Sequence, residues 1–336
     1  MADSEGSIHL NPEIDKIVCS VTGRAYDPKG FLKPIGLCSC CPPPGRPLVV
    51  VYDLETVRER LESNGWGKGP GMWRYGALLP VLGLPWRYAP DVGLTRAVRH
   101  EALGGMNGVD LYLKNEGGNP SGSFKDRGLS VGIALGVACG AKRFCLPTQG
   151  NAGVASTLFS SRLYLPGCLV YMPDGYQGNV YHREAEFFGA EVHFAGENIA
   201  AAGQIMREAY AGELESGELV DMSTFFEPGR LEGKKTMGFE IFDPEVDPDL
   251  LGVDAVQTHR RHPWNPLDRP HDLSLQQVIA LGQVAFGGQP ALEDGRFVLG
   301  GVPATAHGDV SNGVRQLAPH AVHPLEHLGP GQAHFV

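Results

Sequence analysis

The amino-acid sequence predicts an α/β fold with a doubly wound, mainly parallel sheet. Segments typical of strands and of helices alternate between residues 111 and 222, and short turns rich in Gly, Asn or Pro separate them. The chain has 336 residues, which at roughly 150 residues per domain argues for about two packed units. A hydrophobic content of 42% is enough for a sizeable core and excludes disorder over the whole length.

The order of the elements supports a parallel sheet, because expected strands and helices follow one another in turn. The strands are expected at residues 111–114, 143–147, 168–172, 191–195 and 219–222. The helices are expected at residues 125–140, 152–165, 180–188 and 199–210. Asn179 and Asn198 are placed to cap two of these helices, and Ser121 or Ser123 can cap the first. A further helix is expected to open near Asp53.

The charge balance argues against several classes of partner. Lys and Arg number 28 against 38 Asp and Glu, and a net charge of −10 is not typical of a general binder of nucleic acid or anionic membranes. No apolar run approaches the roughly 20 residues that span a bilayer, and the acidic residues 1–6 do not resemble a signal peptide. Seven Cys, an odd number, do not indicate a secreted disulfide framework. We therefore expect a soluble cytoplasmic protein.

A group of cysteines near the N-terminus has part of the spacing of a metal ribbon. Cys38 and Cys41 form one Cys-x-x-Cys pair, but Cys19 is followed by Thr22 where the other pair needs a second thiolate. Structural zinc usually takes four N or S ligands, so three are a weak set unless Cys40 or a distant residue contributes. We expect buried free thiols here and no bound metal.

The first segment that indicates chemistry is Asn-Pro-Ser-Gly-Ser-Phe-Lys-Asp-Arg-Gly at residues 119–128. It places Lys125 at the start of a helix, after a flexible loop rich in hydroxyl groups. A Lys near a helix N-terminus is disfavoured as a cation, and partial burial acts in the same direction, toward the neutral amine that condenses with an aldehyde. The alternative is a solvated surface Lys that is paired with Asp126.

The second segment is Thr-Gln-Gly-Asn-Ala-Gly at residues 148–153, directly after a strand and at the start of a helix. At this place an α/β sheet binds anions or carboxylates through free backbone N–H groups. Asn151 can add a side-chain amide against a ring oxygen. The alternative is a plain helix cap in which Gly allows close packing.

The third segment is Glu-Pro-Gly-Arg-Leu-Glu-Gly-Lys-Lys-Thr at residues 227–236, which we expect to form a loop that leads into an apolar helix start at Met237. A charge density this high is usually found on a solvated surface. Taken alone, this segment would be interpreted in that way.

Together, the three segments resemble the fold-type II pyridoxal-phosphate enzymes, most closely the threonine synthase family. The matching residues are 119–128, 150–153 and 232–236, in the same order and at similar spacing. The resemblance extends from residue 111 to about 256. It implies two doubly wound open-sheet domains, with a small Cys-bearing region before them.

The resemblance also implies pyridoxal 5'-phosphate as the cofactor and a role for each matching residue. Lys125 is expected to be the Schiff-base lysine, and once freed it would move protons as general base and acid. Asn151 is expected to contact the phenolic oxygen of the cofactor, which acts as an electron sink. The substrate carboxylate is expected at the loop formed by Gln149, Gly150, Asn151, Ala152 and Gly153.

The reaction implied is that of threonine synthase, in which O-phosphohomoserine and water give threonine and phosphate. Glu227 stands where some relatives carry an Asn near the substrate phosphate, and a carboxylate there would repel that phosphate. A Ser/Thr dehydratase, or another β/γ-elimination or replacement enzyme, is therefore an alternative. A silent remnant that binds no cofactor is the alternative outside the enzyme class. Relatives are often dimers, which suggests a homodimer that acts on a small amino acid.

The resemblance is lost at two places. Relatives carry Gly-Glu-Gly-x-Thr-Pro-Leu before the strand at 111, which residues 93–100 do not match. After about residue 256 the match ends, and the Gly-rich loop that holds the cofactor phosphate is not found in register. Lys, Tyr and Cys do not occur after Lys235, whereas eight of the twelve His lie from His259 onward.

Two explanations for this tail remain open. Read one base later, the codons for residues 258–262 can spell Pro-Thr-Gly-Gly-Thr, so a single-base slip near Gln257 would put the tail out of frame. The alternative is a genuinely divergent tail. We accordingly divide the chain into three parts. Residues 1–55 are a Cys-containing subdomain, residues 56–256 are an α/β region with the Schiff-base lysine, and residues 257–336 are a divergent or out-of-frame tail.

Overall fold

The computed structural model of the chain describes most residues up to 246 and three short strands beyond them. The described residues are 7–27, 36–83, 85–99, 101–107, 110–241, 243, 245–246, 291–293, 296–298 and 333–335. The chain groups into two compact units, Met1–Thr95 with Glu116–Glu240 and Arg96–Asn115 with Ile241–Val336. Most of the tail at 257–336, and with it the choice between a frameshift and a divergent sequence, lies outside the described residues.

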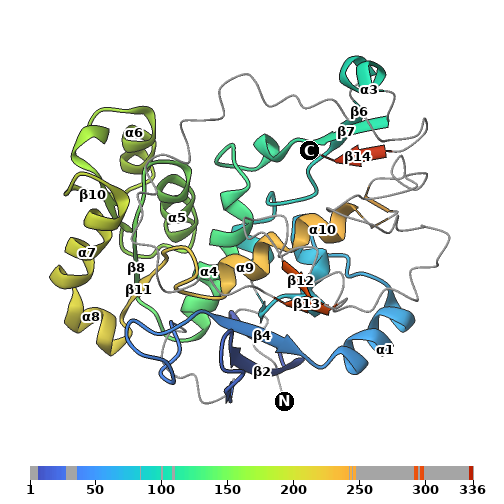
Figure 1. Ribbon diagram of the computed structural model, residues 1–336, viewed down its shortest axis with the longest axis horizontal. Helices are drawn as coiled ribbons and strands as arrows, with labels where there is room; N and C mark the ends of the chain where they lie inside the picture. Colours follow the sequence, from blue (N-terminus) through green and yellow to red (C-terminus); the bar gives the residue numbers. More distant parts are fainter. Residues whose placement is uncertain are drawn as a thin grey trace. The chain divides into compact units, whose positions relative to one another are not determined.

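The first unit is built around a parallel sheet, which confirms the predicted α/β class. Its strands are β8 (Arg143–Pro147), β9 (Leu169–Met172), β10 (Glu191–Phe194) and β11 (Leu219–Asp221), in the order β10-β9-β8-β11 (Figure 1). The chain runs outward from β8 through β9 to β10 and then returns to place β11 on the other side of β8. The gap between the ends of β8 and β11 is therefore a topological switch point, where α/β sheets bind ligands.

Helices cover both faces of this sheet. They are α4 (Lys125–Ala138), α5 (Asn151–Arg162), α6 (Val180–Phe187), α7 (Ile199–Ala209) and α8 (Ala211–Ser216). Neighbouring strand residues point to opposite faces. Phe144 of β8 lies against Gly136 of α4, whereas Cys145 packs with Ala202 and Met206 of α7. Figure 1 shows α7 and α8 on one side of β8 and β11, and α4 and α5 on the other.

Asn side chains cap α6 and α7 where the sequence predicts, whereas α4 has Phe124 at its N-cap and no side-chain cap. Asn179 and Asn198 accept backbone N–H groups in the first turns of α6 and α7, at 2.8 and 3.0 Å. At α4 the hydroxyl of Ser123 accepts the N–H of Lys125 at 3.1 Å, whereas Ser121 bonds to a carboxylate. Local polar chemistry thus sets the starts of these helices.

The N-terminal segment belongs to the first unit. Its antiparallel sheet has the order β3-β2-β4, formed by Ala25–Tyr26, Ile14–Cys19 and Leu48–Tyr52. Three helices follow: α1 (Leu54–Asn64), which Asp53 caps, the 3-10 helix η2 (Gly71–Leu78) and α2 (Pro85–Tyr88). Strand β1 (His9–Leu10) pairs with β5 (Val81–Leu82). The hydroxyl of Tyr52 donates to Glu232 at 2.6 Å. This unit therefore continues past the predicted boundary after residue 55.

Most of the charged segment 227–236 is helical and buried, whereas the sequence predicted a loop. It forms α9 (Gly229–Lys234) and leads into α10 (Thr236–Ile241). α9 packs closely on α4 because both helices have glycines at the contact: a Cβ on Gly233 would lie 1.9 Å from the carbonyl oxygen of Arg127. Two of the segment's charged side chains, Glu232 and Lys235, are tolerated inside because they are paired with each other.

The second unit contains short strands. β7 (Asp110–Lys114) is antiparallel to β6 (Ala97–Arg99) and parallel to β14 (Ala333–Phe335), and the helix α3 (Glu101–Asn107) separates β6 from β7. β12 (Ala291–Glu293) and β13 (Arg296–Val298) pair antiparallel. The expected strand at 111–114 is thus present, but in a sheet apart from the parallel one. The second doubly wound domain falls largely on residues that the structure does not describe.

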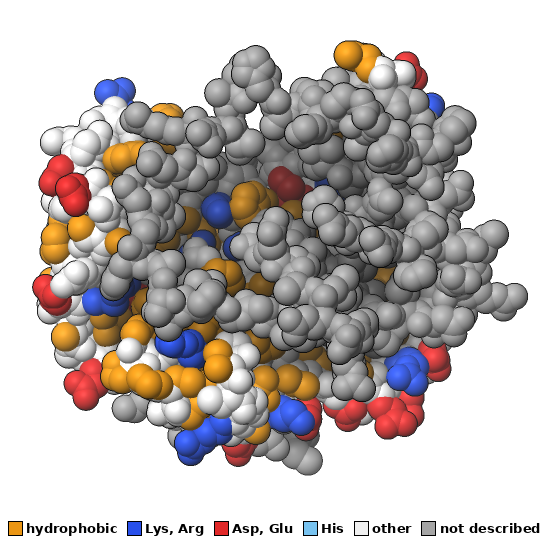
Figure 2. Space-filling view, in the orientation of Figure 1, with side chains coloured by type: hydrophobic (Ala, Val, Ile, Leu, Met, Phe, Trp, Pro, Cys, Tyr) orange, Lys and Arg blue, Asp and Glu red, His pale blue; other side chains and the backbone are white. Residues whose placement is uncertain are grey.

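The described surface is mixed in charge. On the face in Figure 2, acidic and basic side chains are interspersed over the part that the structure describes, as is typical of a solvated surface. Two 3-10 turns, η3 (Glu116–Gly118) and η4 (Asp174–Tyr176), complete the elements. Each helix of the described residues is too short or too polar to cross a membrane.

Candidate active site

A pocket of about 520 Å³ opens at the switch point of the parallel sheet. Its walls come from residues 147–152 at the end of β8 and directly after it, and from Ser223, Thr224 and Phe226 after β11. The starts of α4, α6 and α9 and three residues of α7 complete the lining. All of these residues belong to the first unit. The size is within the range of small-molecule sites, and the fold places loops from two neighbouring strands around one space.

Lys125 lies in the wall of this pocket, at the first turn of α4. The residue is half-buried, and its Nζ lies 4.2 Å from the centroid of the Phe124 ring. Loss of solvent lowers the pKa of the amine, and the positive charge of Arg230 lowers it further. Asp126, the partner expected for a surface Lys, is itself buried and accepts hydrogen bonds from Ser121. The amine is therefore biased toward its neutral, nucleophilic form.

The loop between β8 and α5 supplies backbone donors to the same pocket. α5 begins at Asn151, and Gly150 before it provides no side-chain cap. The first N–H groups of a helix have no partner within it, so those of Asn151 and Ala152 can donate to an anion. Thr148 fixes the loop by accepting the Gly150 N–H at 3.1 Å. Gln149 also lines the pocket.

Gly153, the last residue of the predicted carboxylate loop, is not among the pocket-lining residues. It packs α5 onto the sheet instead: a Cβ here would lie 2.8 Å from Thr148 Cγ2 and 3.1 Å from a methyl of Val170. The two interpretations of residues 148–153 therefore apply to different residues. The first part of the loop faces the pocket, and the second glycine allows close packing.

Arg230 lies in the pocket wall together with the cations Lys125 and Arg207, and its side chain is almost fully buried. Arg207 is paired with Asp221 at 2.9 Å. One terminal nitrogen of Arg230 donates to the carbonyl oxygen of Met222. Within the part of the chain that the structure describes, its Nε is buried without a hydrogen-bond partner. An unmet buried donor costs about 1–3 kcal/mol. An anion that accepts a hydrogen bond from this guanidinium would remove that cost.

Glu227 is buried beside Arg230 and is not among the residues that line the pocket. Its two carboxylate oxygens accept the backbone N–H of Arg230 at 3.0 and 3.3 Å. Burial raises the pKa of Glu227 to about 7, although the positive charge of Arg230 acts in the opposite direction. The carboxyl group thus holds the first turn of α9 and the position of Arg230. The repulsion expected between this carboxylate and a substrate phosphate is reduced by that engagement.

Lys234 adds positive potential near the site. Its Nζ lies 5.8 Å from the centroid of the Phe124 ring, whereas the Nζ of Lys125 lies 4.2 Å from the same centroid. Burial, followed by repulsion from Arg230 and Lys125, lowers the pKa of Lys234 to about 8. The three cations therefore disfavour one another's charge, and a bound anion would offset this repulsion.

A buried ion network holds α4 in place behind the pocket. The guanidinium of Arg127, fully buried, donates to Glu116 at 2.6 Å and to Glu240 at 2.5 Å. Its remaining donors reach the hydroxyls of Thr95 and Thr236, each at 3.0 Å. Arg127 thus ties three segments of the first unit, at Thr95, at Glu116 and in α10, to the helix that begins with the candidate lysine.

A second buried group holds α9. Glu232 accepts hydrogen bonds from Lys235 Nζ at 2.5 Å and from Tyr52 Oη at 2.6 Å. Burial lowers the pKa of Lys235, whereas Glu232 opposes that change. The motif at residues 232–236 is therefore mainly a structural support, and the pocket-facing cation of this region is Arg230.

The pocket contains residues that the sequence singled out and others that it did not. The loop 148–152 and Lys125 come together as expected from strand ends and helix starts. Arg230, Tyr181 and the residues after β11 were not singled out. Ser223 and Thr224, directly after a parallel strand, were a usable signal, because strand carboxyl ends meet at one edge of the sheet.

Comparison with known proteins identifies the family. A model of the pyridoxal-phosphate dependent enzymes matches residues 88–256 of the chain. The chain belongs to this family. The prediction of a fold-type II pyridoxal-phosphate enzyme from Lys125 and its neighbouring motifs is thereby confirmed, and the matched range contains both Lys125 and the 148–153 loop.

Among curated proteins, the chain is similar to threonine synthases. It is 31% identical over 227 residues to the enzyme of Methanocaldococcus jannaschii, covering 67% of this chain and 53% of that protein. It is 32% identical over 200 residues to that of Methanosarcina acetivorans, covering 58% and 46%. The pyridoxal-phosphate enzyme described here thus spans about half the length of the curated relatives it matches.

Solved structures of pyridoxal-phosphate enzymes also resemble the chain in part. A processed threonine deaminase isoform 2 from Solanum lycopersicum covers 51% of this chain and 47% of its own, with a TM-score of 0.41 at 21% identity. Serine racemase from maize covers 61% and 52%, with a TM-score of 0.42 at 18% identity.

Proposed function

We propose that the chain acts as a pyridoxal-phosphate enzyme of the threonine synthase type, which converts O-phosphohomoserine and water to threonine and phosphate. One observation carries the proposal: the pocket combines a half-buried amine, Lys125, with two separate places for an anion. These are the uncapped start of α5 at Asn151 and the guanidinium of Arg230.

The pocket residues fit the aldehyde and the ring oxygen of the cofactor. Lys125 has the lowered pKa that an amine needs to hold an aldehyde, and Asn151 offers an amide to the ring oxygen. When bound, the cofactor takes up the electron pair of the bond broken at the substrate's α-carbon. Lys125 is the group in this pocket that can remove a proton from that carbon and return one. The residues around Gly150 would hold the substrate carboxylate and so orient the α-carbon toward the amine.

The second anion place favours a phosphorylated substrate. Serine and threonine carry one carboxylate, which the α5 start can bind, and they bring no second anion of their own to the Arg230 Nε. O-Phosphohomoserine carries a second anion that this cation can take. A phosphate also offsets the mutual repulsion of Arg230, Lys125 and Lys234.

The test compares substrates and a cation variant on the purified full-length chain. We expect phosphate release from O-phosphohomoserine, and Arg230→Gln should reduce kcat/KM for it by about 10–100-fold, the worth of one charge-assisted hydrogen bond. Formation of a 2-oxo acid from serine or threonine without phosphate turnover would instead support the dehydratase alternative.

A spectrum separates either enzyme from the silent remnant. We expect visible absorbance from the lysine-bound cofactor that disappears in Lys125→Ala. A colourless chain without pyridoxal phosphate by mass analysis would contradict the proposal. The homodimer and the cytoplasmic location stay predictions, which sedimentation of the purified protein and fractionation of cells would test.

A further inference from the structure

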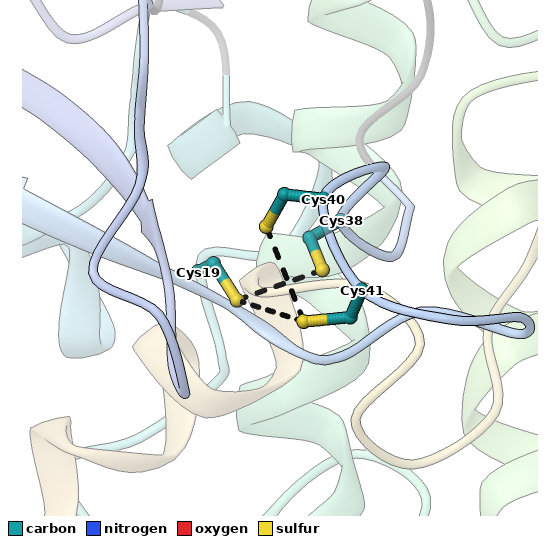
Figure 3. A group of neighbouring side chains, drawn as sticks. All are labelled: Cys19, Cys38, Cys40 and Cys41. Carbon is teal, nitrogen blue, oxygen red and sulfur yellow. Dashed lines mark hydrogen bonds between the residues drawn. The ribbon is translucent and has the colours of Figure 1, made fainter.

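The structure brings together four cysteines that are separated in sequence. Cys19 ends strand β2, whereas Cys38, Cys40 and Cys41 lie on the loop before β4 (Figure 3). Their four Sγ atoms all lie within 4.8 Å of one another. Cys19 and Cys38 are buried, and the other two are partly buried. The cluster belongs to the antiparallel sheet of the first unit and is separate from the residues that line the pocket.

The spacing of the sulfur atoms is that of a tetrahedral metal site. A zinc ion about 2.3 Å from each of four sulfurs sets those sulfurs about 3.8 Å apart. The observed Sγ–Sγ distances are 3.5 Å for Cys19–Cys38, 3.7 Å for Cys19–Cys41 and 4.0 Å for Cys40–Cys41. They lie on both sides of the tetrahedral value and well above the roughly 2.05 Å of a disulfide bond.

Cys40 takes the place that the sequence pattern leaves to Thr22. A second Cys-x-x-Cys pair would need a thiolate at position 22, and the Thr22 hydroxyl lies 3.2 Å from Cys40 Sγ. Cys40, which lies between Cys38 and Cys41, therefore adds a fourth ligand to the three cysteines that the sequence spacing indicates. This contact was not available from the sequence, which favoured free thiols.

The backbone around the cluster suits thiolate sulfurs. The Thr22 N–H donates to Cys19 Sγ at 3.5 Å, and the Arg46 N–H donates to Cys38 Sγ at 3.3 Å. Hydrogen bonds to a charged sulfur favour its ionised form and orient it. Cys19 also pairs with Leu48 in the β2–β4 ladder, so the sheet fixes one side of the cluster.

We propose that Cys19, Cys38, Cys40 and Cys41 form a structural zinc site. Four thiolates fill the coordination shell of Zn²⁺ and leave no open position, so the ion would hold the loop before β4 onto the end of β2 and take no part in catalysis. The preference for sulfur and a tetrahedral arrangement selects Zn²⁺ over hard cations such as Mg²⁺.

Metal content of the purified full-length chain tests the site. We expect about one Zn²⁺ per chain by elemental analysis, and Co²⁺ in its place should give the absorption of a tetrahedral thiolate complex. Cys40→Ser should weaken Zn²⁺ binding at least about tenfold, since it removes a ligand. Cys168→Ala, a buried cysteine outside the cluster, is the matched control and should keep its zinc.

A compensating variant keeps the test decisive if Cys40→Ser folds poorly. Thr22→Cys combined with Cys40→Ser restores the second Cys-x-x-Cys pair and should recover Zn²⁺ binding. A wild-type chain that takes up neither Zn²⁺ nor Co²⁺ on titration under reducing conditions would overturn the proposal. Undiminished Zn²⁺ affinity in Cys40→Ser would overturn the role of Cys40. Both readouts are independent of catalytic activity.

Discussion

Replacing Arg127 by Met removes the cation from between two carboxylates while keeping much of the side-chain volume. Arg127 and Glu240 both have fully buried side chains, 2.5 Å apart at their closest atoms, and Glu116 is largely buried on the other side. The variant would leave Glu240 as a buried carboxylate that has lost its guanidinium partner, although the Leu94 N–H still donates to it at 2.8 Å. Breaking a buried pair in this way costs about 3–5 kcal/mol.

Equilibrium denaturation by urea, followed by circular dichroism, measures this cost. The matched control is Arg162→Met, which breaks the bonds to Asp91 at 2.7 and 2.9 Å in a partly exposed pair, where the expected loss is about 0–1 kcal/mol. Arg127→Met with Glu240→Gln should regain part of the stability because one buried charge is gone. Equal effects of Arg127→Met and Arg162→Met would refute the argument that burial determines the cost.

Two further predictions concern α9. Gly233→Ala should lower the free energy of unfolding by about 1–3 kcal/mol, because its Cβ would lie 1.9 Å from the Arg127 carbonyl oxygen. The control is Gly212→Ala in α8, where a Cβ would meet nothing within 4 Å and the change should be neutral or stabilising. Thermal melts of the two variants measure the difference. For Glu227, a pKa raised by burial from 4.5 to about 7 means that the folded state binds more protons than the unfolded state between these values. Stability from this group is therefore full below about pH 4.5 and is lost as the pH rises toward 7. Melting temperatures across this range should fall less in Glu227→Gln than in wild type, and parallel curves would contradict the assignment.

Local sequence patterns determined the elements of the parallel sheet. The strand at 143–147 has the predicted bounds, and α6 and α7 start after their predicted Asn caps. These features depend on hydrophobic periodicity and on side chains that bond to backbone within three residues. The location of the pocket followed as well, because the carboxyl ends of parallel strands meet at one edge.

Tertiary structure alone decided how the charges and thiols are used. Residues 227–236 have the composition of a solvated surface, yet Glu232 is buried because Tyr52, distant in sequence, bonds to it. Arg230 becomes a pocket residue because α9 packs on α4, and Cys40 joins Cys19 because a loop folds back on β2. Such partners are far apart in the chain, so no local periodicity encodes them. Only the packed fold determines which charge is neutralised and which remains available to a ligand.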